Sequence, residues 1–227
     1  MTKPNLYVAS CSFGKDSIAT ILLALEHNEP IDRVVFAEVM FDHERGISGE
    51  IPEHIEWIYN TAIPRLEQMG VKVDVVRSEK DYKGMAYRVN KDGSYYGLKY
   101  AMPCFANYHL KVHPIKKYLA NFKKEYELIE YIGIASNEPI RLERIKNTNR
   151  ISLLDKYGVT EKMALDKCKQ YNLVSPLYSN SSRGEGAGFV LMPKLKNFSS
   201  CELNTNVFGV NLKICTTKQE ANTLKMV

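Results

Sequence analysis

The sequence predicts an α/β fold: a twisted parallel sheet of about five strands with helices on both faces. Four apolar runs are continuous rather than alternating, as expected of strands buried on both faces. They cover residues 6–10, 34–41, 71–76 and 128–135. Helical patterns lie between these runs, and strands that alternate with helices favour a parallel sheet.

The expected helices cover residues 16–27, 53–69 and 108–126, and a further one at 161–171 follows the last strand. A chain of 227 residues is long enough to bury one sizeable core. We therefore expect one α/β domain over residues 1–183, with helical C-terminal elements. Residues 184–227 show no hydrophobic period, so we expect an irregular, poorly ordered tail there.

Composition narrows the class of protein. The apolar fraction of 44% and the charged fraction of 25% are ordinary for a globular protein. A net charge of +5 suits a phosphorylated small molecule without demanding nucleic acid. The first apolar run is too short for a signal sequence or a membrane span, so we expect a cytoplasmic protein with no membrane partner.

Cysteine usage indicates a reduced compartment. The five cysteines are odd in number and form no C-x-x-C pair, so neither a disulfide framework nor a zinc or iron–sulfur site is expected. They are Cys11, Cys104, Cys168, Cys201 and Cys215. His43 lacks a second ligand at metal-binding spacing, and we predict no metal-ligating set.

The most informative stretch is the SFGKDS loop, residues 12–17, between the first strand and the first helix. A strand, a tight turn at Gly14 and a helix together point free backbone N–H groups at an anion. Lys15 adds a cation, and two serine hydroxyls add donors. Asp16 suits a helix cap or a Mg²⁺ ligand. An ordinary capped turn is the alternative interpretation.

This loop resembles the S-G-G-x-D-S pyrophosphate-binding loop of the PP-loop ATP pyrophosphatase superfamily, with Phe13 in place of the first Gly. A second block, residues 133–144, resembles the G-I-x-x-D-E-x-x-R-x-x-R block of the phosphoadenosine phosphosulfate (PAPS) reductase family, a branch of that superfamily. Asn137 stands where the family usually has Asp. From residue 6 to about 183, the order and spacing of the blocks are similar to the family's.

The resemblance implies an adenine nucleotide alpha-hydrolase-like (Rossmann-like) fold that binds ATP or PAPS, with Mg²⁺. It implies that Lys15, Asp16 and Arg141 take part in catalysis. The residues expected to bind the nucleotide are Ser10, Ser12, Phe13, Gly14, Lys15, Asp16, Ser17, Met40, Gly133, Glu138, Arg141 and Arg144.

Two of these expectations also have a basis in the residues themselves. Arg141 and Arg144 are three apart on a helix, so they share a face and can clamp an anion, although an ion pair with Glu138 or Glu143 is the alternative. The backbone around Met40 follows the second strand and would face adenine, although a solvated loop is the alternative.

The resemblance leaves two reactions open. One is adenylyl transfer from ATP with release of pyrophosphate, and the other is reduction of a sulfonucleotide by a nucleophilic cysteine, as in sulfur metabolism. Reductases of that kind carry a C-terminal motif resembling E-C-G-x-H, which this chain lacks. A nucleotide-binding remnant is a further alternative. So is an accessory protein that acts with a protein partner, or as a homo-oligomer, on nucleic acid through the lysine-rich helix at 108–126.

The sequence from about residue 184 differs from the pattern of the resembling family. Relatives often carry G-C-W-F-C-P near residue 184, and this chain has a Gly-rich segment there instead. Codons permitted for residues 186–197 can spell C-W-F-C-P-N-A-K-I-K-E in a shifted frame. We therefore hypothesise that the chain from about Glu185 is translated out of the ancestral frame; a divergent Gly-rich tail is the alternative.

Overall fold

A computed structural model describes residues 2–93 and 106–178. It also describes the backbone of residues 98–99, 105, 203–207, 210–214 and 223–226. Cys104, Cys201 and Cys215 lie outside the described residues, and so does most of the predicted tail.

A five-stranded parallel sheet forms the centre of the molecule, in the order β5-β2-β1-β7-β8. Its strands are β1 (Asn5–Cys11), β2 (Arg33–Glu38), β5 (Val73–Arg77), β7 (Glu127–Tyr131) and β8 (Arg150–Ile151). The predicted fold class, an α/β fold with a parallel sheet of about five strands, is confirmed. In this order the chain reverses its direction of travel between β1 and β7.

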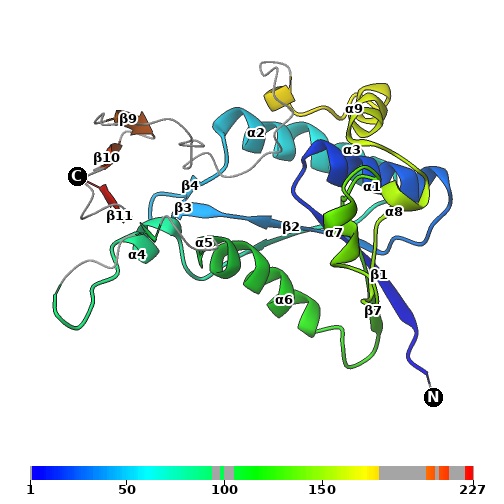
Figure 1. The fold of residues 1–227 in the computed structure, drawn as a ribbon, viewed down its shortest axis with the longest axis horizontal. Coiled ribbons are helices and arrows are strands. Elements are labelled where there is room, and N and C mark those ends of the chain that lie inside the picture. The colour runs from blue at the N-terminus through cyan, green and yellow to red at the C-terminus, as the bar shows by residue number, and fades with distance from the viewer. Residues whose placement is uncertain are drawn as a thin grey trace.

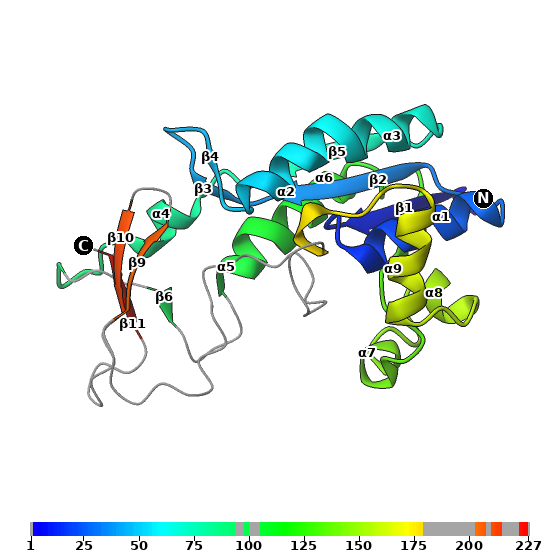
Figure 2. The same ribbon diagram turned by 90° about the horizontal axis from the view of Figure 1, so that it is seen from above.

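Helices cover both faces of the sheet (Figures 1 and 2). One face carries α1 (Lys15–Glu26), α2 (Pro52–Trp57), α3 (Ile63–Gln68), α8 (Leu153–Lys156) and α9 (Glu161–Gln170). The main hydrophobic cluster lies on this side, where α1 packs against β1, α8 and α9. The other face carries α5 (Phe105–Asn107) and α6 (His113–Ala120), and α6 buries Leu119 against Leu6, Val8 and Val35.

Two of the expected helices are interrupted by a π-helical turn. Ile58–Ala62 joins α2 to α3, and Tyr108–Val112 joins α5 to α6. In each case a proline is the second residue of the helix that follows, Pro64 or Pro114. Proline lacks an N–H and clashes with the carbonyl four residues earlier, and the wider π turn removes that conflict.

Two predicted strands end earlier than the apolar runs that predicted them. The run 34–41 divides into β2 and β3 (Met40–Asp42), and β3 leaves the sheet to pair with β4 (Ile47–Ser48). Strand β7 ends at Tyr131, and the chain then turns at Ile132–Ile134. The helix predicted to run to residue 126 ends at Ala120.

The remaining elements are short. They are α4 (Tyr82–Ala86), α7 (Pro139–Glu143), the 3-10 helix η3 (Pro176–Tyr178), and a second sheet of β6 (Leu98–Lys99), β11 (Thr223–Met226), β10 (Val210–Ile214) and β9 (Leu203–Val207). Residues 82–100 thus contain α4 and β6. Among the described residues, no helix has the length and apolar character needed to cross a membrane.

Candidate functional site

A cavity of about 510 Å³ lies at the carboxyl ends of β1 and β7, where the sheet order reverses. This is the position at which open α/β sheets bind ligands. Of the residues named from the sequence, the cavity collects Ser10, Ser12, Gly14, Lys15, Asp16, Ser17, Gly133, Glu138 and Arg141. It adds Lys111, Glu161 and Tyr178 from three other elements.

Phe13 has a backbone conformation that favours glycine. Its φ is +56°, in the left-handed region that costs a residue with a Cβ about 1–2 kcal/mol. The ring is 1% exposed and packs edge-on against Phe36, with ring centroids 5.1 Å apart. Burial of such a ring contributes about 1.5–3 kcal/mol, which offsets the backbone strain. Phe13 therefore supports the loop from beneath and does not line the cavity.

The hydroxyl of Ser17 closes the loop on itself. It donates a hydrogen bond to the Gly14 carbonyl at 2.9 Å and accepts one from the Ser12 amide at 3.3 Å. Helix α1 begins here without a side-chain cap, and Gly14 is in extended conformation. The residue at the N-cap position of α1 therefore does not cap the first-turn amides with its own side chain.

Gly133 brings β7 into direct contact with the SFGKDS loop. A Cβ at this position would lie 2.8 Å from the carbonyl carbon of Asp16 and 2.8 Å from the amide nitrogen of Ser17. Both atoms are backbone, so the contact cannot be relieved by rotating a side chain. Only glycine fits, and the cavity owes its shape to this contact.

Lys15 extends into the cavity between two carboxylates. Its Nζ lies 2.8 Å from Asp16 and 3.0 Å from Glu161, and the residue is 7% exposed. Burial acts to lower the pKa of Lys15, but the hydrogen bonds to both carboxylates outweigh it and the pKa is raised. An ammonium group has three donors, and three carboxylate oxygens of Asp16 and Glu161 lie within hydrogen-bonding distance of Lys15, so a ligand oxygen must compete with them.

The Asp16 carboxylate accepts hydrogen bonds from Lys15 and does not cap the N-terminus of α1. Burial raises its pKa, and the bond from Lys15 works in the opposite direction. Nearby Glu161 and Glu138 raise the pKa further. The carboxylate is thus available to a cation as well as to Lys15.

Tyr178 and Glu161 are functional candidates that the sequence did not single out. The Tyr178 hydroxyl accepts a hydrogen bond from the Lys15 amide at 3.0 Å, the position an anion oxygen would take at this helix terminus. Burial raises the pKa of Tyr178. No local pattern marks either residue, because each lies more than a hundred positions from Lys15.

The two arginines of the predicted clamp are placed differently. Arg141 lines the cavity and donates to both carboxylate oxygens of Glu138 at 2.6 Å, as in the alternative interpretation. Arg144 is exposed at the end of α7 and does not line the cavity. Asn137 accepts a hydrogen bond from the Glu161 amide at 3.2 Å, which ties this block to the start of α9.

The predicted adenine contact at Met40 lies outside the cavity lining. Met40 is buried in β3, and the neighbouring Glu38 accepts hydrogen bonds from Tyr59 at 2.6 Å and from Arg77 at 2.8 Å. Burial, with the bond to Glu38, raises the pKa of Tyr59 to about 12. The carboxyl end of β2 is therefore closed by the side chains of Glu38, Tyr59 and Arg77.

The described cysteines have the character of core residues. Burial raises the pKa of Cys11 to about 11 and that of Cys168 to about 12. Both are therefore protonated at neutral pH and poor nucleophiles. In the part of the chain that the structure describes, no group of three or more His, Cys, Asp or Glu side chains is arranged to hold a metal ion. His43 contacts the Ser78 carbonyl through Nε2 at 2.9 Å.

His54 supports the loop from the core side. It is fully buried, and its Nδ1 lies 2.8 Å from the Ser175 hydroxyl, close to η3 and Tyr178. Burial lowers the pKa of His54 to about 4, against a smaller opposing effect of the Ser12 backbone. Its Nε2 makes no hydrogen bond within the described residues. The imidazole is therefore neutral at pH 7.

Comparison with known proteins adds little to this picture. No protein-family model matches the sequence, and no curated protein matches it. Among solved structures, the chain is similar to the U34-tRNA thiolase NcsA from Methanococcus maripaludis, whose structure contains a 4Fe–4S cluster. The TM-score is 0.40 at 16% identity, and the match covers 75% of this chain and 58% of NcsA. The chain thus matches little more than half the length of NcsA, and the fold assignment rests on the strand order itself.

Proposed function

We propose that this protein binds an adenine nucleotide in the cavity between β1 and β7, with its phosphates at the N-terminus of α1. We propose further that it transfers the adenylyl group of ATP and releases pyrophosphate, as a member of the PP-loop superfamily and its PAPS reductase branch. The observation that carries the proposal is the contact of Gly133 with the SFGKDS loop, which sets Lys15 in a cavity at the switch point of the sheet.

The roles of the residues follow from their positions. The first-turn amides and the Lys15 ammonium, once a phosphate displaces a carboxylate from it, bind pyrophosphate oxygens, which stabilises the charge that builds up on the leaving group. Arg141 is half-exposed and leaves Glu138 to contact a phosphate. Asp16 and Glu161 would supply carboxylate oxygens to a Mg²⁺ ion bound with the nucleotide, and the ion would shield the phosphate charge.

Reduction of a sulfonucleotide is the less favoured reaction. It needs a thiolate that can reach the nucleotide. Cys11 lines the cavity but is buried and protonated at neutral pH, and Cys168 is buried, protonated and outside the lining.

One observation favours a second candidate, a nucleotide-binding protein without turnover. Lys15 and Arg141 are both neutralised by carboxylates of the chain itself. Ligand phosphates must displace these carboxylates, and that competition lowers affinity and weakens catalysis.

Calorimetric titration with MgATP, combined with an assay of pyrophosphate release, tests the proposal. Lys15→Ala should weaken ATP binding about 10- to 100-fold, because a charge-assisted hydrogen bond contributes roughly 1.5–3 kcal/mol. Lys167→Ala is the matched control. Lys167 lies on α9, pairs with Glu26 of α1 and does not line the cavity.

The outcomes separate the candidates. Absence of ATP binding, or equal effects of the two substitutions, would refute the proposal. Binding without release of pyrophosphate would favour the second candidate. Release that requires added tRNA or DNA would favour the accessory role in nucleic-acid modification.

A further inference from the structure

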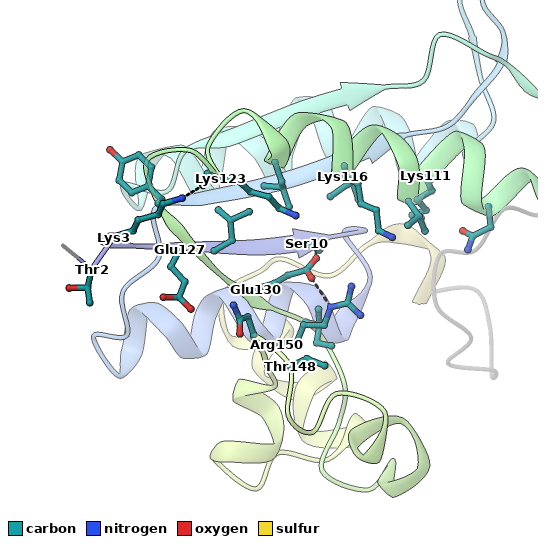
Figure 3. A pocket seen from close by; sticks show the side chains of 18 residues that line it. Thr2, Lys3, Ser10, Lys111, Lys116, Lys123, Glu127, Glu130, Thr148 and Arg150 are labelled. Atoms are coloured by element: carbon teal, nitrogen blue, oxygen red, sulfur yellow. Dashed lines mark hydrogen bonds and ion pairs between the residues drawn. The ribbon is translucent and has the colours of Figure 1, made fainter.

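A second cavity opens from the nucleotide cavity. Its volume is about 930 Å³, and Ser10, Lys111, Ile115 and Ile132 line both cavities. Figure 3 shows this groove between α6, with its lysines, and the strands that carry Ser10, Glu130 and Arg150. The two cavities therefore adjoin, and the SFGKDS loop lines the smaller one.

The groove exists because α6 packs across only part of the sheet. Helix α6 contacts β2 and β5, while the cavity is lined by β7 and β8. Its apolar wall is aliphatic and comes from both sides of the gap. The residues are Val112, Ile115, Leu119, Leu128 and Ile132.

Cations dominate the rest of the lining. Lys3, Lys111, Lys116, Lys123 and Arg150 face two carboxylates, Glu127 and Glu130. One of these carboxylates is already engaged. Glu130 accepts hydrogen bonds from Ser10 at 2.7 Å and from Arg150 at 2.8 Å, the latter shown as a dashed line in Figure 3. The groove thus carries an excess of positive charge along an apolar wall.

Lys111 holds the decisive position, at the junction of the two cavities. It is half-buried, and among the described residues it makes no ion pair or hydrogen bond through its side chain. Lys111 lies in the π turn that precedes α6. Lys117, on α6 itself, pairs by contrast with Glu79 and lines neither cavity. Lys111 is close enough to the buried Glu50 to oppose the rise in the pKa of that carboxyl, but the two form no ion pair. A half-buried ammonium outside an ion pair attracts an anion more strongly than an exposed one does.

We propose that this groove binds the acceptor of the adenylyl group, and that the acceptor is an organic carboxylate with an apolar body. The carboxylate lies at Lys111, beside the nucleotide cavity, and the apolar body lies along the aliphatic wall. This inference rests on the proposed function. The volume falls in the range of roughly 300–1,000 Å³ that small-molecule sites occupy.

Single-stranded nucleic acid fits the groove less well. Such sites stack bases on a series of aromatic side chains. The described lining offers Tyr126 as its aromatic side chain, and the rest of the apolar wall is aliphatic.

The reaction balances without an oxidant or a reductant. A carboxylate oxygen attacks the α-phosphorus of ATP and forms a new P–O bond. The bond from the α-phosphorus to the bridging oxygen breaks, and its electron pair leaves with pyrophosphate. The products are a mixed acyl–adenylate anhydride and pyrophosphate, which the first turn of α1 and Lys15 stabilise.

Methyl NMR of the full chain, titrated with sodium octanoate without nucleotide, tests the site. We expect shifts at the methyl groups of Ile115, Leu119, Leu128 and Ile132. Lys111→Gln should weaken octanoate binding about tenfold, because a charge-assisted contact is lost. Lys117→Gln, on α6 but outside both cavities, should leave the affinity unchanged. Octanol, which lacks the charge, should bind more weakly than octanoate.

Several results would overturn the inference. Octanoate does not bind in the groove if the shifted methyl groups lie outside it. The same conclusion follows if Lys111→Gln and Lys117→Gln weaken octanoate binding equally. An octauridylate that shifts the groove methyl groups when octanoate does not would assign the surface to nucleic acid. Because nucleotide is absent from this titration, the two failures can be told apart. ATP binding without octanoate binding removes the groove site alone. Octanoate binding without ATP binding removes the proposed function and the acceptor role, and leaves a carboxylate site.

Discussion

At the scale of single residues, His54 links the support of the SFGKDS loop to pH. It is fully buried and neutral, and burial lowers its pKa to about 4 from an ordinary value of 6.5. Between these two values the unfolded chain binds a proton that the folded chain does not, so folding stability falls as the pH falls. Stability from this residue is complete above pH 6.5 and is lost progressively down to pH 4.

We therefore predict that the free energy of unfolding drops by about 2 kcal/mol between pH 7 and pH 5 on account of His54. Urea denaturation at the two pH values measures the drop. His54→Leu should lower stability at pH 7, since the contact with Ser175 is lost, but should remove most of the pH dependence. His43→Leu, at an exposed position, is the control and should keep the full dependence. An unchanged pH dependence in His54→Leu would contradict the prediction.

At the scale of elements, the packing of the β7 turn on α1 defines the nucleotide cavity. We predict that Gly133→Ala destabilises the fold by about 1–3 kcal/mol, because its Cβ would meet backbone atoms of Asp16 and Ser17 at 2.8 Å and force the two elements apart. ATP affinity should fall as well, by about tenfold or more, because the amides of α1 would be displaced.

The control for this change is Gly46→Ala. Gly46 has a φ of +66° and open space around it, so the substitution carries only a backbone cost of about 1–2 kcal/mol. Both variants should lose stability in urea denaturation, but Gly46→Ala should keep its ATP affinity. Equal affinities in the two variants would show that the contact of Gly133 does not shape the site.

Element boundaries were harder to predict than element types. The apolar run 34–41 predicts one strand, yet β2 ends at Glu38 and the chain departs to form β3. Val39 and Phe41 are buried in a separate cluster with Tyr82, Met85 and Leu110. A run of apolar residues shows that each side chain is buried, but it does not show which core buries it.

At the scale of the whole molecule, we propose that the nucleotide-binding unit is contained in residues 1–183. The described members of the hydrophobic clusters and of both cavities all lie before residue 179. The described part of the tail instead pairs with β6, where Leu224 and Thr223 of β11 lie opposite Leu98 and Lys99.

We predict that a chain ending at residue 183 unfolds cooperatively and binds ATP within about twofold of the full chain, since no described core contact is removed. Urea denaturation followed by circular dichroism, and calorimetric titration with MgATP, test this. A truncated chain that fails to fold or to bind ATP would place 184–227 inside the nucleotide-binding unit. Sequencing of the coding DNA across residues 183–193 tests the frameshift hypothesis independently.

The sequence by itself determined the kinds of element, the parallel sheet and the loop at the helix N-terminus, because these follow from local hydrophobic period and turn chemistry. It also named Gly133 and Lys15, which the tertiary structure brings to one cavity. It could not tell that Arg144 is exposed while Arg141 meets Glu138, or that Lys111 faces inward while Lys117 faces outward. The partners of Lys15 were equally hidden, since Glu161 and Tyr178 lie 146 and 163 positions away. Only the folding of distant segments onto one sheet edge decides such contacts, because local sequence patterns carry no information about them.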